Sequence, residues 1–236
     1  MAVVLPALLV GAGAWVVTAR ALHHPQEVLA SPGGPPGASA SPSLVPSSPP
    51  PSPATVAFAT VRGLTLYVPA LDVVTLGYHE ASYPVAFAMT PLGRCVHDYN
   101  RYKFTKPPPT AGPDYIVMSS RGRPHPATSA VDVAMRPGTV VLSPVTGRVA
   151  SVRHYLLYGR TPDIRLAIWP EGRTKIQVVI EHLTDVRVRR GQQLFAGVTP
   201  IATPRILPFS SQVNDYIGAG IPHIHVEVNT FGHPPQ

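Results

Sequence analysis

The pattern of apolar and polar positions predicts a strand at residues 221–228, near the C-terminus. Valine and isoleucine alternate there with polar positions, which are His223, His225 and Glu227. Because alternate side chains of a strand point to one face, the two imidazoles and the carboxylate are expected to project together. Two imidazoles held side by side suit a metal ligand next to a proton-transfer group. The same pattern also fits a strand whose polar face carries two histidines without a chemical role.

Similar alternation recurs along the chain, and no helical period is sustained after residue 54. Short strands separated by Gly and Pro turns are predicted at residues 56–60, 63–68, 115–118, 140–152, 164–169, 176–180 and 186–194. The strand at 176–180 runs directly into His182. An all-β, mostly antiparallel domain is therefore expected, and about 180 residues are enough for one sizeable core.

The N-terminal part of the chain has a different composition. Residues 1–22 are apolar, with no charge before Arg20, and predict a helical membrane anchor or a signal peptide. Residues 23–54 are rich in Pro, Ser and Gly and cannot bury a core, so a disordered linker is expected. Either interpretation places the rest of the chain outside the cytoplasm, and an anchor would make the membrane a partner through this segment.

The remaining residues are predicted to form an N-terminal β extension at 55–113, which carries no assignable motif, and a main domain at 114–236. In the extension, His79 is followed by Glu80, as in a helical H-E-x-x-H zinc motif. Tyr83 stands where the second His of that motif would be. His79 is therefore interpreted as a structural or rim histidine, with a place lining the cleft as the alternative.

The balance of charges is basic: 19 Lys and Arg against 12 Asp and Glu give a net charge of +7. Such a balance suits an anionic partner, such as nucleic acid, an acidic membrane surface or an anionic wall polymer. No basic run interleaved with aromatic residues and no nucleic-acid motif is present, so nucleic acid is not expected as a partner. The single cysteine, Cys95, excludes an internal disulfide and a cysteine-rich zinc site.

A series of motifs in the second half occurs in a characteristic order. His125 and Asp132 precede V-D-V-A and P-G-T elements, and a G-R-V hairpin follows. Next come a strand that ends in His182-Leu183, a V-R-x-G-Q turn and the final H-x-H-V-E-V strand. In this order, residues 115–228 resemble the lysostaphin-type zinc endopeptidases, which cleave peptide cross-links in bacterial peptidoglycan. The resemblance implies a hybrid of β barrel and sandwich, with a duplicated hybrid motif.

The resemblance also implies roles for the matching residues. Asp132 and His225 correspond to zinc ligands, and His182 and His223 correspond to the catalytic pair that handles protons and steadies the developing oxyanion. The family's first ligand is a His four residues before the Asp, where this chain has Thr128. His125, seven residues before Asp132, is the expected substitute, so the predicted zinc ligands are His125, Asp132 and His225.

Three functions follow from these patterns. The favoured one is a zinc-dependent endopeptidase of the cell envelope that cleaves peptidoglycan peptides. If His125 points away, two ligands remain, and the chain would resemble inactive family members that bind the cell wall or regulate other wall hydrolases. The hairpin at 140–152 also resembles biotinyl and lipoyl carrier domains, but its tip lacks the acceptor lysine that these domains require.

Overall fold

The computed structural model describes residues 51–230. The anchor or signal segment predicted at 1–22 lies outside the described residues, and so does the predicted linker as far as residue 50. Within 51–230, no helix is long and apolar enough to cross a membrane. The helix found in this range, α1 (Asn214–Ile217), has four residues.

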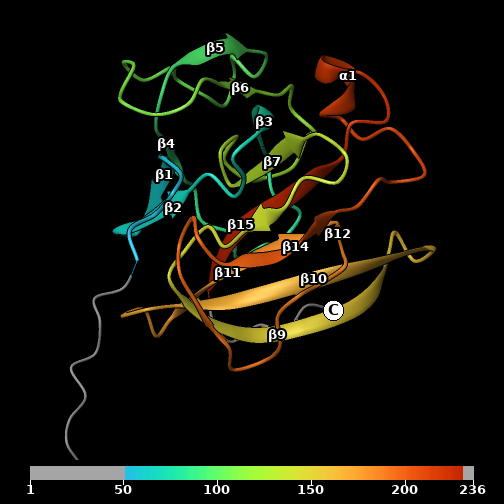
Figure 1. Ribbon diagram of the computed structural model, residues 1–236. Helices are drawn as coiled ribbons and strands as arrows, with labels where there is room; N and C mark the ends of the chain where they lie inside the picture. The colour runs from blue at the N-terminus through green and yellow to red at the C-terminus, as the bar shows by residue number, and fades with distance from the viewer. Residues whose placement is uncertain (1–50, 231–236) are drawn as a thin grey trace, which may run out of the picture. The chain divides into compact units, whose positions relative to one another are not determined.

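A nine-stranded sheet forms the largest layer of this part of the chain (Figure 1). In spatial order its strands are β13 (Gln193–Leu194), β9 (Gly147–Leu157), β10 (Thr161–Pro170), β11 (Ile176–Glu181), β15 (His223–Thr230), β7 (Ala130–Met135), β3 (Val73–His79), β6 (Tyr115–Val117) and β5 (Cys95–Asp98). Neighbouring strands are antiparallel, except that β6 runs parallel to both β3 and β5. The long strands β9 and β10 form a hairpin beside β11.

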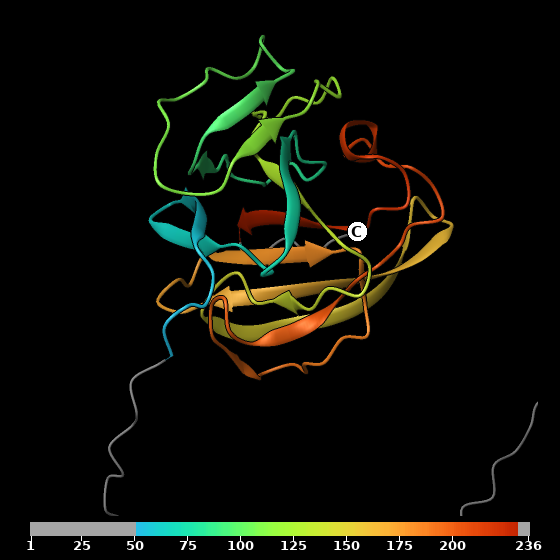
Figure 2. The same cartoon turned by 45° about the horizontal axis from the view of Figure 1, so that its top comes forward.

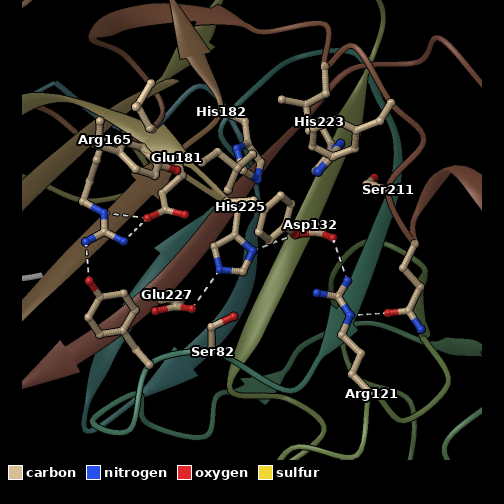
Figure 3. A pocket seen from close by; sticks show the side chains of 18 of the residues that line it. Ser82, Arg121, Asp132, Arg165, Glu181, His182, Ser211, His223, His225 and Glu227 are labelled. Atoms are coloured by element: carbon tan, nitrogen blue, oxygen red, sulfur yellow. Dashed lines mark hydrogen bonds and ion pairs between the residues drawn. The ribbon is translucent and has the colours of Figure 1, made fainter. Parts of the chain in front are cut away.

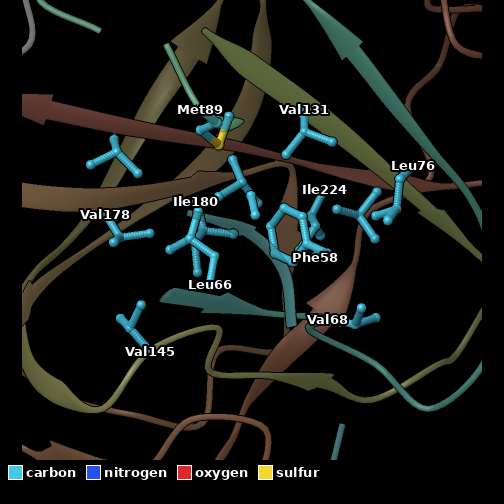
Figure 4. Packing of buried hydrophobic residues seen from close by; sticks show 14 of the residues in the cluster. Phe58, Leu66, Val68, Leu76, Met89, Val131, Val145, Val178, Ile180 and Ile224 are labelled. Atoms are coloured by element: carbon cyan, nitrogen blue, oxygen red, sulfur yellow. The ribbon is translucent and has the colours of Figure 1, made fainter. Parts of the chain in front are cut away.

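Two three-stranded sheets accompany the large one. The first has the order β2 (Leu64–Tyr67), β1 (Ala57–Val61) and β4 (Thr90–Pro91). The second has the order β12 (Leu183–Thr184), β14 (Pro200–Pro204) and β8 (Val141–Leu142). Side chains from the small sheets and from the large sheet pack into one hydrophobic core, where Phe58, Leu66, Ile180 and Ile224 are fully buried (Figure 4).

The all-β prediction is confirmed by this architecture. The expected closure into a barrel is not found among the described strands, because the large sheet is open. Its order begins at β13 and ends at β5, and these two edge strands do not pair with each other.

Residues 55–113 contribute to two different sheets. They form the whole β1, β2 and β4 sheet, and they also place β3 in the large sheet between β7 and β6 (Figure 2). In the register of β3 with β7, Gly77 lies opposite Asp132 and His79 lies opposite Ala130. The segment predicted as an extension therefore supplies a strand next to the one that carries Asp132.

Both faces of β15 are buried. Ile224 is fully inaccessible within the core, and the polar residues His223 and Glu227 are each 2% exposed. Burying apolar side chains of this size contributes roughly 1.5–3 kcal/mol each, so this strand is firmly held. Polar groups buried at this level require partners, which excludes a solvated face with incidental histidines.

Candidate metal centre

Three neighbouring strands bring together a group of metal-ligating side chains. His225 on β15 lies directly opposite Asp132 on β7. His79, the last residue of β3, lies diagonally across from Asp132, within the reach of side chains on paired strands. His79, Asp132 and His225 each offer one ligand atom, and these atoms all lie within 4.8 Å of one another.

The distances in this group centre on one carboxylate oxygen. His79 Nε2 lies 3.0 Å from Asp132 Oδ1, and His225 Nδ1 lies 2.8 Å from the same oxygen. Ligand atoms around a tetrahedral zinc, with bonds of ~2.0–2.2 Å, lie about 3–4 Å apart. Two imidazoles and one carboxylate are a donor set that zinc accepts, so these residues fit such an ion.

The other ring nitrogens of the two histidines already have hydrogen-bond partners. His79 Nδ1 donates to the carbonyl oxygen of Glu80 at 2.9 Å. His225 Nε2 donates to Glu227 Oε1 at 2.8 Å (Figure 3). Such bonds to a carbonyl or carboxylate fix the tautomer and orient the ring of a metal-ligating histidine. They leave His79 Nε2 and His225 Nδ1 directed at the shared site.

The carboxylates control the protonation of this group. Burial lowers the pKa of His225, but its hydrogen bonds to Asp132 and Glu227 outweigh burial and raise the pKa to about 10. Burial also acts to raise the pKa of Asp132, whereas the neighbouring histidines hold it well below its usual value. Because a ligating imidazole must be neutral, a metal ion at this site would displace the proton between His225 and Asp132.

His79 occupies the place that was predicted for His125. His79 is fully buried, whereas His125 is half-buried in the loop before β7 and is not part of the metal-ligating group. That loop folds into a tight turn in which Ser129 Oγ accepts from the Ala81 backbone N–H at 2.8 Å and donates to the Pro126 carbonyl at 2.7 Å. The turn anchors the loop to the chain after β3 and so does not bring His125 back to Asp132.

Thr128, at the family's usual first-ligand position, has a structural role. Its hydroxyl donates to the carbonyl oxygen of Met89 at 2.7 Å, and the residue is buried. This side chain is therefore occupied away from the metal-ligating group.

His182 lies at the end of β11, beside the metal-ligating group. Its ring centroid is 5.1 Å from that of His223 and 6.0 Å from that of His225. The backbone of His182 has φ +64°, a left-handed conformation that is uncommon and costly for a residue with a side chain. Such strain often occurs at functional sites.

A buried carboxylate fixes the orientation of His182. Its Nδ1 donates to Asp163 Oδ2 at 2.6 Å, and the Tyr155 hydroxyl donates to the same oxygen at 2.8 Å. Burial acts to raise the pKa of Asp163, but the hydrogen bond from His182 keeps it lowered. Because Nδ1 carries the proton in this bond, Nε2 of His182 is left as a proton acceptor.

His223 lies on the same face of β15 as His225, and its environment keeps it uncharged. Burial lowers the pKa of His223 to about 4, although the charge of Asp132 acts in the opposite direction. Its ring is therefore neutral near pH 7. A neutral imidazole can still donate one hydrogen bond.

These groups meet at a cavity of about 900 Å³. Asp132, His182, His223 and His225 all line it (Figure 3). Four of the five predicted site residues therefore come together. Neither His125 nor His79 lines this cavity, but His79 reaches the site through its contact with Asp132. A volume of this size is within the range of pockets that bind small molecules and peptide side chains.

Two residues of the candidate site, His79 and Asp163, were not assigned to it from the sequence. His79 had the H-E signal, but its role depends on the pairing of β3 with β7 rather than on a helical spacing. Asp163 lies on β10, where polar residues alternate with apolar ones, and this alternation was the available signal. The partner of each residue is distant in the sequence, so neither assignment followed from a local motif.

Comparisons with known proteins find similarity in structure. No protein-family model and no curated protein matches the chain. The chain is similar to a solved structure described as a zinc-containing peptidase from Vibrio cholerae, with 22% identity and a TM-score of 0.31. The match covers 71% of this chain and 43% of the other, so this chain spans less than half of that protein's length. The functional proposal therefore depends on the geometry of the site itself.

Proposed function

We propose that this protein is a zinc-dependent endopeptidase that hydrolyses peptide bonds of bacterial peptidoglycan. The observation that carries the proposal is the convergence of His79, Asp132 and His225 on one possible metal site, of which Asp132 and His225 line a cavity together with His182 and His223. Three protein donors with an open position are what a catalytic zinc requires. The peptidoglycan substrate rests on the resemblance of the motifs to the lysostaphin-type enzymes.

His79, Asp132 and His225 would hold the zinc ion, which supplies a Lewis acid that makes water nucleophilic near neutral pH. His182 accepts a proton at Nε2, because Asp163 holds the proton on Nδ1. His223, which is neutral, donates a hydrogen bond to the oxygen of the scissile carbonyl as negative charge develops there. Glu227 keeps the ring of His225 in place through the bond to Nε2.

The proposed location is the cell envelope. An apolar segment at residues 1–22 followed by a Pro-rich linker at 23–54 suits a domain that is held near a membrane or secreted. The net charge of +7 favours residence near anionic wall polymers. Both points support an extracytoplasmic peptidase whose partners are the wall peptides and, through the N-terminal segment, the membrane.

The proposal is tested by comparing two histidine variants of the full chain. His79→Ala removes a buried metal ligand. The zinc content, measured by elemental analysis, is expected to fall from about one ion per chain to near zero. His125→Ala is the matched control, because it removes a half-buried histidine outside the group and is expected to leave the zinc content unchanged. Hydrolysis of purified peptidoglycan is measured for both variants and is expected to be lost with His79→Ala alone.

Two outcomes would contradict the proposal. If His125→Ala lost zinc while His79→Ala retained it, the identity of the metal centre would be wrong. If the wild-type chain bound zinc but released no peptides from peptidoglycan, the enzymatic function would fail, and a wall-binding or regulatory domain would be the better description.

A further inference from the structure

More arginines than carboxylates line the cavity beside the metal centre. Arginines line it at four positions: Arg121, Arg123, Arg153 and Arg165. Carboxylates line it at three positions: Asp132, Glu181 and Glu227. The way in which these charges pair with one another indicates what the cavity can bind.

The three carboxylates already have partners within the protein. Glu181 accepts from Arg165, and Glu227 accepts from His225 at 2.8 Å. Asp132 belongs to the metal centre, and its Oδ2 lies 3.5 Å from Arg121 Nη2. None of these groups is left to neutralise a further arginine of the cavity wall.

Two of the arginines are held firmly by these contacts. Arg165 donates from Nε to Glu181 at 2.5 Å and from Nη1 to the Tyr83 hydroxyl at 2.7 Å. Its guanidinium also lies over the Tyr83 ring, 4.7 Å from the centroid. Arg121 donates from Nε to Gln212 Oε1 at 2.5 Å (Figure 3). These contacts give both side chains a structural role.

The other two arginines have no carboxylate partner among residues 51–230. Arg123 Nη1 donates to the backbone carbonyl of Glu80 at 2.8 Å, and its guanidinium makes no ion pair. The Glu80 carboxylate is itself occupied by Lys103 at 2.7 Å and by the Ser120 hydroxyl. Burial and the charge of Arg121 lower the pKa of Arg123, although the carboxylates of Glu227 and Glu80 act in the opposite direction.

Arg153 is the most informative of the four. It lies directly opposite Arg165 in the pairing of β9 with β10, so both arginines are on the same face of the sheet. Like charges placed opposite each other destabilise a sheet. Glu181 offsets Arg165, but Arg153 is exposed, and its side chain makes no ion pair or hydrogen bond with the described residues. The repulsion between Arg153 and Arg165 lowers stability, and both residues line the cavity. A bound anion would offset that repulsion.

We propose that Arg123 and Arg153 form a subsite for a carboxylate group of the bound peptide. Arginine is suited to this role because its planar guanidinium binds carboxylates through two parallel hydrogen bonds. The inference rests on the proposed peptidase function for the identity of the ligand, and it deepens that function. Peptides with a free carboxylate near the bond that is cut are preferred over the same peptides with that group neutralised.

The test measures peptide binding by calorimetry with the full chain after zinc has been removed with a chelator, so that no hydrolysis intervenes. The ligands are soluble peptides from digested peptidoglycan, either with free carboxylates or after chemical amidation. Arg123→Gln and Arg153→Gln are each expected to weaken binding of the free-acid peptides by about 5- to 10-fold. Amidated peptides are expected to bind weakly and equally to the wild type and both variants.

Arg190→Gln is the matched control. It removes the same charge from an exposed arginine that does not line the cavity, and it is expected to leave both affinities unchanged. Equal binding of free-acid and amidated peptides by the wild type, or no binding of either, would overturn the subsite. If Arg190→Gln weakened binding as much as Arg123→Gln and Arg153→Gln, the effect would be due to overall charge, and the subsite would also be overturned. Peptidoglycan hydrolysis by the zinc-loaded protein is scored separately, so failure of the peptidase function is distinguishable from failure of the subsite.

Discussion

The orientation of His182 by Asp163 gives the sharpest mechanistic prediction. Asp163 is 1% exposed, and its Oδ2 accepts hydrogen bonds from His182 Nδ1 and from the Tyr155 hydroxyl, while Oδ1 accepts from the Ile164 backbone N–H at 2.8 Å. Asp163→Asn has nearly the same shape but can present an amide N–H to His182. Nδ1 must then be the acceptor, so the proton moves to Nε2 and the ring can no longer take a proton at the cavity.

The size of the effect follows from the bond that is lost. A hydrogen bond to a charged group contributes about 1.5–3 kcal/mol. Since each 1.36 kcal/mol changes a rate tenfold, kcat for peptidoglycan hydrolysis is expected to fall by about 10- to 160-fold. KM and zinc content are expected to stay near the wild-type values, because Asp163 is not one of the three residues of the metal-ligating group.

Two further measurements separate positioning from a general structural defect. The ¹⁵N NMR shifts of the His182 ring are expected to report the proton on Nδ1 in the wild type and on Nε2 in Asp163→Asn. Tyr155→Phe keeps the carboxylate and removes one hydrogen bond, so its kcat is expected to fall less. If Asp163→Asn kept the wild-type kcat and the wild-type tautomer of His182, the reasoning would be refuted.

Two other predictions concern stability. Zinc at a free concentration of 100 times its Kd is expected to stabilise the wild type by about 2.7 kcal/mol, seen as a higher Tm that chelation reverses. His79→Ala is expected to show no increase in Tm with zinc. An increase as large as that of the wild type would mean that zinc binds elsewhere. Gly93→Ala is expected to destabilise the fold by more than ~1–3 kcal/mol, measured by denaturant unfolding. Its Cβ would lie 1.9 Å from the Pro113 carbonyl oxygen, in a backbone with φ +102°. Gly159→Ala, where φ is +69° and no atom lies within 4 Å of the Cβ, is the control and should cost clearly less; equal losses would show that the close contact is unimportant.

The sequence predicted those parts of the site that depend on local periodicity. Alternation at 221–228 was enough to place His223 and His225 on one face of a strand, whereas Asp132, in the apolar run that forms β7, was assigned from the family resemblance. The approach of Asp132 to His225 then follows from the antiparallel pairing of these strands. Periodicity of this kind is robust because a shift of one residue would move every side chain to the opposite face.

The choice between His125 and His79 as third ligand depends on register between distant segments, and the structure places His79 in the metal-ligating group. His79 and Asp132 are 53 positions apart, and only the pairing of β3 with β7 brings them together. His125 was favoured because it is the nearest histidine before Asp132 and the family resemblance allows this longer spacing. In the structure, Ser129 ties the loop between them to the Ala81 backbone N–H, and His125 is not part of the metal-ligating group. Whether the sheets close into a barrel is also determined by long-range pairing at the edges, which strand-by-strand patterns do not specify.

The position of β3 has a consequence for how the protein can be divided. It contributes His79 and also covers the side of β7 that faces away from β15. A fragment that begins at residue 114 would therefore lack His79, the proposed third ligand, and would expose the backbone N–H and C=O groups along β7 as an unpaired sheet edge. Under the proposed function, the motif-bearing half of the chain would not form a complete metal centre without the segment that precedes it.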